Sequence, residues 1–126
     1  MPNMAHLLSV GLGGFVGAIA RFWISGLAQR MSDRFPLETL SVNLLGSFLL
    51  GLLATLFLEK MEVSQELRLF ILVGLLGAFT TYSTFSLETL NLFRGGAWML
   101  ATGNILANVF GTLIAVWAGV LLAKLW

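Results

Sequence analysis

The sequence predicts an all-α membrane protein with four transmembrane helices, the third of them broken near its middle. Three observations lead to this fold class. Of the 126 residues, 58% are apolar and only 10% are charged, too few charges for the surface of a soluble domain of this length. The apolar residues form four long stretches between short charged loops, and the third stretch carries a dense run of hydroxyl side chains.

The four stretches form a single transmembrane domain over residues 1–126. They run over residues 5–28, 38–58, 67–93 and 97–123, each long enough for the roughly 20 helical residues that cross a bilayer. Pro36 suits the start of the second helix, and Ser64 followed by Glu66 predicts the start of the third. Four spans place both chain ends on one side of the lipid bilayer.

Lys and Arg are balanced between the two sides of this domain. Residues Lys60, Arg68 and Lys124 lie on the side of the termini and second loop, and Arg30, Arg34 and Arg94 lie on the other. Since loop Lys and Arg set orientation, equal counts fit two interpretations. Either the orientation signal is weak, or the protein inserts both ways and pairs as an antiparallel, dual-topology homodimer with a two-fold axis in the membrane plane.

The third stretch contains "GAFTTYSTFS", residues 77–86, with five hydroxyl side chains in ten residues. Single Ser or Thr residues in membrane helices bond back to the i−4 carbonyl or join helices. A run of this density, preceded by Gly74 and Gly77, instead indicates a helix interruption over residues 77–81, where hydroxyls satisfy the freed backbone groups. Interrupted spans are typical of ion and substrate sites, so the break predicts transport.

Polar residues in the other helices recur at helical spacing. The stripes are Thr39, Asn43 and Ser47 in the second helix, Asn104, Asn108 and Thr112 in the fourth, and Tyr82, Phe85, Ser86 and Thr89 on one face of the third. They fit either a shared polar path or hydrogen bonds that join helices. Amide NH2 groups, hydroxyls and aromatic ring edges present positive charge, which suits a small anion that hydrogen-bonds strongly.

Two charged residues, Arg21 and Glu88, lie inside the apolar stretches. A charge at a helix centre costs about 2.5–3.5 kcal/mol on insertion scales, so neither should face lipid. They fit either a structural ion pair or the lining of a water-filled vestibule, and Glu88 leaves proton coupling open. The chain has no cysteine and a single histidine, His6, which excludes thiolate sites and catalytic triads. A net charge of +1 provides no nucleic-acid surface, and we expect no enzyme.

Three segments resemble the Fluc/CrcB family of fluoride channels over essentially the whole chain. They are "GAIARF" (17–22), "TLSVNLLGSFLLG" (39–51) and "GLLGAFTTYSTFSLET" (74–89). The resemblance implies a multi-pass protein of the bacterial cell (inner) membrane that exports the fluoride ion by passive, selective electrodiffusion and protects the cell from fluoride toxicity. It also implies an antiparallel dual-topology homodimer with two pores.

The resemblance assigns roles to particular residues. The pore-lining residues that it implies are Asn43, Tyr82, Ser83, Thr84, Phe85, Asn104, Asn108 and Thr112. The backbone carbonyls of Gly77 and Thr80 correspond to ligands of a structural sodium ion at the dimer axis. Arg21 matches an arginine of the family's first helix with a structural or vestibular role. Tyr82 stands where the family more often has Phe, and Asn104 and Asn108 where Tyr or Ser is more usual.

Two other functions fit a small four-helix membrane protein. A proton-coupled multidrug exporter of this size uses an embedded carboxylate, typically in the first helix, and residues 5–28 contain none. A non-transporting assembly subunit of a membrane complex would explain the Gly- and Ser-rich helix contacts and would carry no ion flux.

Overall fold

Four helical spans make up the chain, as the sequence predicts. The computed structural model describes all residues from Met1 to Trp126. The first span is α1 (Met4–Gln29), and the second is α2 (Leu37–Thr55) continued by the π-helix η1 (Leu56–Lys60). The third consists of α3 (Gln65–Arg68), the π-helix η2 (Leu69–Leu75), α4 (Leu76–Phe79) and α5 (Tyr82–Arg94), and the fourth is α6 (Trp98–Lys124). All four are long and apolar enough to cross a membrane.

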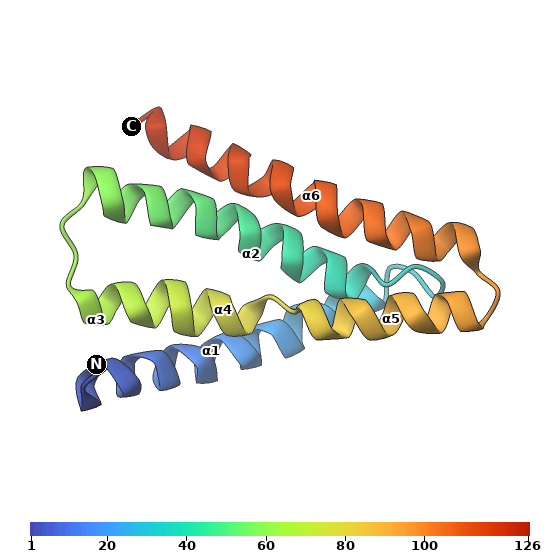
Figure 1. Ribbon diagram of the computed structural model, residues 1–126, viewed down its shortest axis with the longest axis horizontal. Helices are drawn as coiled ribbons and strands as arrows, with labels where there is room; N and C mark the ends of the chain where they lie inside the picture. The colour runs from blue at the N-terminus through green and yellow to red at the C-terminus, as the bar shows by residue number, and fades with distance from the viewer.

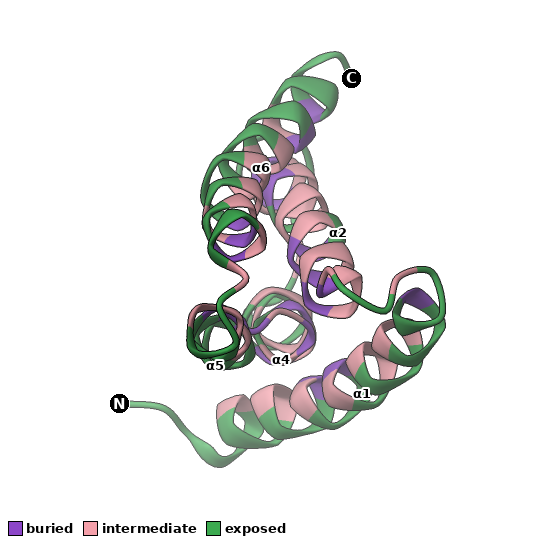
Figure 2. Ribbon diagram, turned by 90° about the vertical axis from the view of Figure 1, so that its right-hand side faces the viewer, coloured by how far each residue is buried: buried purple, intermediate pink, exposed green.

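The spans run antiparallel, and both termini lie at the same end as the second loop (Figure 1). In the end-on view, α6 and α2 lie side by side, α4 and α5 lie next to α2, and α1 flanks this group (Figure 2). The closest packing joins α2 to α6 and α1 to η2 and α4. The half of the third span before the break therefore packs against α1, whereas the half after it, α5, packs mainly against α6.

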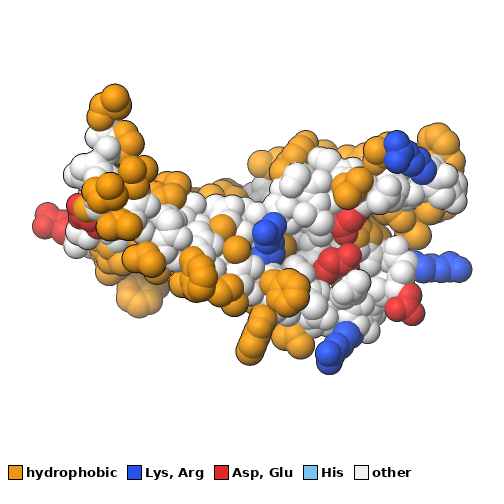
Figure 3. All heavy atoms as spheres, turned by 90° about the horizontal axis from the view of Figure 1, so that it is seen from below, with side chains coloured by type: hydrophobic (Ala, Val, Ile, Leu, Met, Phe, Trp, Pro, Cys, Tyr) orange, Lys and Arg blue, Asp and Glu red, His pale blue; other side chains and the backbone are white.

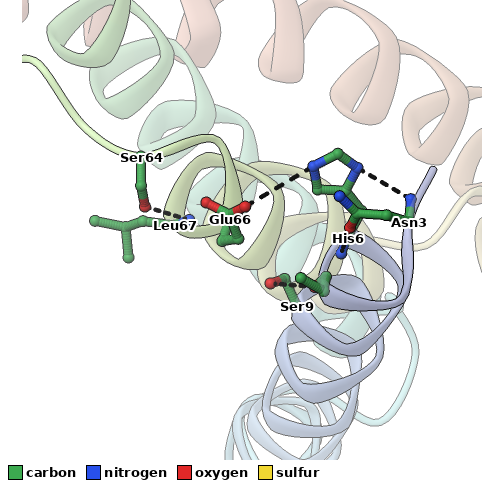
Figure 4. A network of polar contacts seen from close by, with 7 residues as sticks. Asn3, His6, Ser9, Ser64, Glu66 and Leu67 are labelled. Atoms are coloured by element: carbon green, nitrogen blue, oxygen red, sulfur yellow. Dashed lines mark hydrogen bonds and ion pairs between the residues drawn. The ribbon is translucent and has the colours of Figure 1, made fainter. Parts of the chain in front are cut away.

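Short polar motifs begin and end the helices. At the start of α1, the Asn3 side chain accepts the His6 N–H at 2.9 Å and the His6 ring accepts the Asn3 N–H at 3.4 Å (Figure 4), a reciprocal cap that satisfies free N–H groups. Ser64 caps α3 by accepting the Leu67 N–H at 3.1 Å, which confirms the predicted start. The imidazole of His6 lies 3.9 Å from the Glu66 carboxylate, so the two helix starts meet at this end.

Glycines bring the helix backbones into direct contact. A Cβ added at Gly13 would overlap the Phe70 carbonyl oxygen, and one at Gly17 would overlap that of Leu75. Across the same contact, a Cβ at Gly74 would lie 2.6 Å from the Val10 oxygen. Lipid removes most of the hydrophobic drive for helix association, so close packing at small residues and Cα–H···O contacts stabilise the pair instead. This glycine contact holds α1 against η2, which α4 separates from the break.

The outer surface is apolar along the length of the helices. Figure 3 shows one face of the molecule, with hydrophobic side chains along much of its body, charged groups at both ends, and a few charged groups in between. Large apolar side chains such as Phe15, Trp23 and Trp117 are exposed. Such a surface suits a lipid environment.

Candidate functional site: the interrupted third span

The third span is interrupted at two residues, Thr80 and Thr81. Helix α4 ends at Phe79, Thr80 (φ −87°, ψ 159°) and Thr81 (φ −149°, ψ 122°) are extended, and α5 begins at Tyr82. The gap is visible between α4 and α5 in Figure 1. Residues 77–79 remain helical, so the predicted interruption at 77–81 begins too early. Thr81 caps the second half-helix, because its hydroxyl accepts the Thr84 N–H at 3.2 Å.

Asn43 of α2 satisfies the backbone of the break. Its Oδ1 accepts the Thr81 N–H at 2.8 Å, and its Nδ2 donates to the Thr81 carbonyl at 3.0 Å. The amide of Asn43 therefore replaces the helix partners that an extended residue loses. In an unbroken helix the Thr81 N–H would donate to the Gly77 carbonyl. Because it donates to Asn43 instead, the Gly77 oxygen loses its helical donor.

A chain of amides continues from Asn43 across the bundle. Asn43 Nδ2 also donates to Asn108 Oδ1 at 2.9 Å, and Asn108 Nδ2 donates to Asn104 Oδ1 at 2.9 Å. Asn104 Nδ2 donates to the Thr89 hydroxyl at 2.9 Å, which in turn donates to the Phe85 carbonyl at 2.8 Å. All of these side chains are buried. Members of the stripes of the second, third and fourth spans thus meet in one network of hydrogen bonds that joins these helices.

A groove of about 420 Å³ opens beside the break. Of the residues predicted to line a pore, five line it: Asn43, Tyr82, Phe85, Asn108 and Thr112. The two residues predicted to offer carbonyls to sodium, Gly77 and Thr80, line it as well. The rings of Tyr82 and Phe85 meet edge to face with centroids 5.4 Å apart. The groove thus combines an amide, a hydroxyl, ring edges and a backbone carbonyl without its helical donor.

Three predicted pore residues lie away from this groove. Asn104 is fully buried within the amide chain, and Ser83 and Thr84 are exposed on the first turn of α5. Tyr82, Phe85, Ser86 and Thr89, which the spacing places on one face of α5, differ in their exposure within the single chain. Phe85 and Thr89 are buried, whereas Tyr82 and Ser86 are exposed, because the edge of the buried face runs between these two rows.

Comparison with known proteins identifies the family of this chain. The profile of the family described as CrcB-like protein, Camphor Resistance (CrcB), matches residues 8–120. The chain belongs to this family. This membership confirms the resemblance of the three sequence segments, and together with the four apolar spans it makes the chain a multi-pass bacterial membrane protein.

Curated relatives in the CrcB family match over nearly the whole chain. The fluoride-specific ion channel FluC of Ruminiclostridium cellulolyticum is 46% identical over 125 residues, which are 98% of this chain and 96% of the relative. The protein of the same name from Sulfurovum sp. is 51% identical over 119 residues (94% and 93%), and that from Magnetococcus marinus is 50% identical over 117 residues (92% and 95%).

The two intramembrane charges of this CrcB chain are not paired with each other. Glu88 Oε1 accepts a hydrogen bond from the Thr39 hydroxyl, and Glu88 Oε2 is buried without a partner. Glu88 also lines a second cavity of about 360 Å³, together with Glu38 and Arg34. The only side chains of the chain that approach within ion-pair distance are His6 and Glu66, so Arg21, which is half-buried, forms no ion pair. The structure therefore contradicts the interpretation that Arg21 and Glu88 form a structural ion pair.

Two residues that the family resemblance does not assign to the pore lie at this CrcB site, and of these the spacing of polar residues includes only Thr89. Thr89 joins α5 to Asn104, and Gly46 faces the break directly, since a Cβ there would overlap the Thr80 methyl group. The spacing offered a signal for Gly46, because it follows Asn43 by three residues and so lies on the same face of α2.

Proposed function

We propose that this protein is a fluoride-selective ion channel that exports fluoride by passive electrodiffusion and protects the cell from fluoride toxicity. The observation that carries the proposal is the match, at 46–51% identity over at least 92% of the chain, to relatives named fluoride-specific ion channel FluC. A channel forms and breaks no covalent bond, so the protein is no enzyme.

The chemistry of the groove supports an anion that accepts strong hydrogen bonds. Fluoride must exchange its water for directed donors, and conduction requires binding weak enough for release. Amide N–H groups and the positive edges of aromatic rings provide such contacts without a fixed cation. Both Asn43 hydrogens are donated inside the chain, so fluoride beside Asn43 would replace Asn108 as the acceptor of one of them. The Phe85 and Tyr82 rings border the same space.

We further propose that two chains pair antiparallel and complete the pores together. The groove lies at the surface of one chain, and its Tyr82 side chain is 77% exposed. A second chain would bury this face and contribute residues to each of two pores. The equal Lys and Arg counts of the two loop faces support insertion in both orientations, which an antiparallel homodimer needs.

A structural sodium ion at the dimer axis is the third part of the proposal. Unwound carbonyls of interrupted membrane helices coordinate Na⁺, and the Gly77 oxygen has lost its helical donor to Asn43. The Gly77 and Thr80 carbonyls are the groups that would hold the ion. The cation would supply a partner for oxygens that no helix bond reaches.

Fluoride efflux from liposomes tests the function. The purified protein is reconstituted, liposomes are loaded with potassium fluoride, and external fluoride is followed with an electrode, with potassium chloride liposomes as control. Valinomycin carries potassium out as countercharge. We expect fluoride efflux that starts only with valinomycin and no comparable chloride efflux, because an electrogenic pore needs a counterion. A well-folded protein without fluoride efflux would contradict the proposal and favour the multidrug-exporter or assembly-subunit interpretation.

A further inference from the structure

At Gly46, the backbone of α2 packs directly against the break, because glycine has no side chain to hold them apart. A Cβ at this position would overlap the Thr80 Cγ2 methyl and lie 3.1 Å from Phe79 Cδ2, a separation shorter than ordinary van der Waals contact. Phe79 is the last helical residue before the break and Thr80 the first extended one. The space beside Gly46 where a side chain would lie, which we call the Gly46 socket, is therefore occupied by the side chains of Phe79 and Thr80, where helix α4 ends.

The Thr80 methyl group has a defined direction toward this socket. The Thr80 hydroxyl donates back to the Leu76 carbonyl at 3.2 Å, and this hydrogen bond holds the Thr80 side chain in one rotamer. With the hydroxyl fixed, the methyl on the same Cβ has one position left, and this position is against Gly46. Three residues earlier on the same face, Asn43 holds Thr81 by two hydrogen bonds. One face of α2 thus fixes both extended residues.

We propose that Gly46 is a positioning residue for the ion pathway. The Gly46 socket sets the rotation of the Thr80 backbone and, with it, the directions of the Thr80 carbonyl and of the first turn of α5. A larger residue at position 46 would push Thr80 away and turn these groups. The link to ion flux rests on the proposed channel function, whereas the fit between Gly46 and Thr80 does not.

A double-mutant cycle tests the socket, because removing the Thr80 methyl should make room for a Cβ at position 46. The variants are Gly46→Ala, Thr80→Ser and the double variant, each followed by fluoride efflux and by thermal unfolding in detergent. We expect Gly46→Ala to lower efflux about tenfold in the wild-type background and at most about threefold in the T80S background, since overpacking at one site is relieved at its neighbour. Gly14→Ala is the matched control, because its Cβ would lie 3.9 Å from the nearest atom, the Gly74 oxygen.

Each outcome decides the proposal. Equal effects of Gly46→Ala in the two backgrounds, on efflux and on the unfolding midpoint, would overturn the socket. If Gly46→Ala yields no folded protein, recovery of folded protein by the double variant supports the socket and failure to recover it overturns it. If the wild-type protein carries no fluoride, the proposed function fails, and the coupling of the unfolding midpoints still tests the Gly46–Thr80 fit.

Discussion

At the scale of single residues, Asn43 holds the break with every polar atom of its amide. Asn43→Leu keeps the branched shape and the number of side-chain heavy atoms but leaves the buried Thr81 N–H and carbonyl without their partners. Because each unsatisfied buried group costs about 1–3 kcal/mol, we expect a clearly lower midpoint of thermal unfolding. Ser86→Ala is the control, since the exposed Ser86 hydroxyl only bonds back to the Tyr82 carbonyl. Equal midpoints for the two variants would show that Asn43 does not hold the break.

The spacing of polar residues predicted which of them share a helix face, but not which residues of other helices they bond to. The i, i+4 pattern correctly grouped Asn104 with Asn108, and the structure joins them by a hydrogen bond. It could not predict that Asn108 meets Asn43 or that Asn104 meets Thr89, since those contacts depend on how the helices rotate and slide against one another. The pore assignments, which came from family resemblance, stay predictions for the same reason.

At the scale of elements, the third span shows what composition can and cannot predict. The dense hydroxyl run predicted an interruption, because hydroxyls and glycines are the groups that compensate a broken helix in a membrane. The π-helix η2, which precedes α4 in the third span, was not predicted. Nothing in its apolar sequence distinguishes it from an α-helix. Its backbone packs against Gly13 and Gly17 of α1, a contact between distant segments that periodicity does not contain.

Sodium binding at the interrupted third span can be tested by its effect on the stability of the protein. If the Gly77 and Thr80 carbonyls hold sodium in the folded protein only, ligand binding stabilises that state by about 2.7 kcal/mol at a hundredfold excess over Kd. We therefore expect the midpoint of thermal unfolding to rise with sodium concentration. The measurement is made at constant ionic strength, with N-methyl-D-glucamine as the replacement cation. A midpoint that is the same in both cations would count against a structural sodium ion.

At the scale of the whole molecule, four spans and a common side for the termini could be predicted from the sequence. Apolar length fixes the number of crossings, and an even number returns the chain to its starting side. The ends of the spans lie within two residues of the expected positions. The groove beside the break could not be predicted, because it depends on the distance between α2, α5 and α6 rather than on any one helix.

Orientation in the membrane is the property of the whole molecule that the balanced charges address. The natural chain contains no cysteine, so a single introduced thiol reports on one loop. Met31 lies in the first loop and Met61 in the second, and both are exposed. We expect Met31→Cys and Met61→Cys each to react in about half of the molecules with a membrane-impermeant maleimide added to intact cells, because equal Lys and Arg counts give no preferred orientation. Permeabilised cells, in which both thiols should react fully, are the control. Complete labelling at one position and none at the other would establish a single orientation and exclude the antiparallel homodimer.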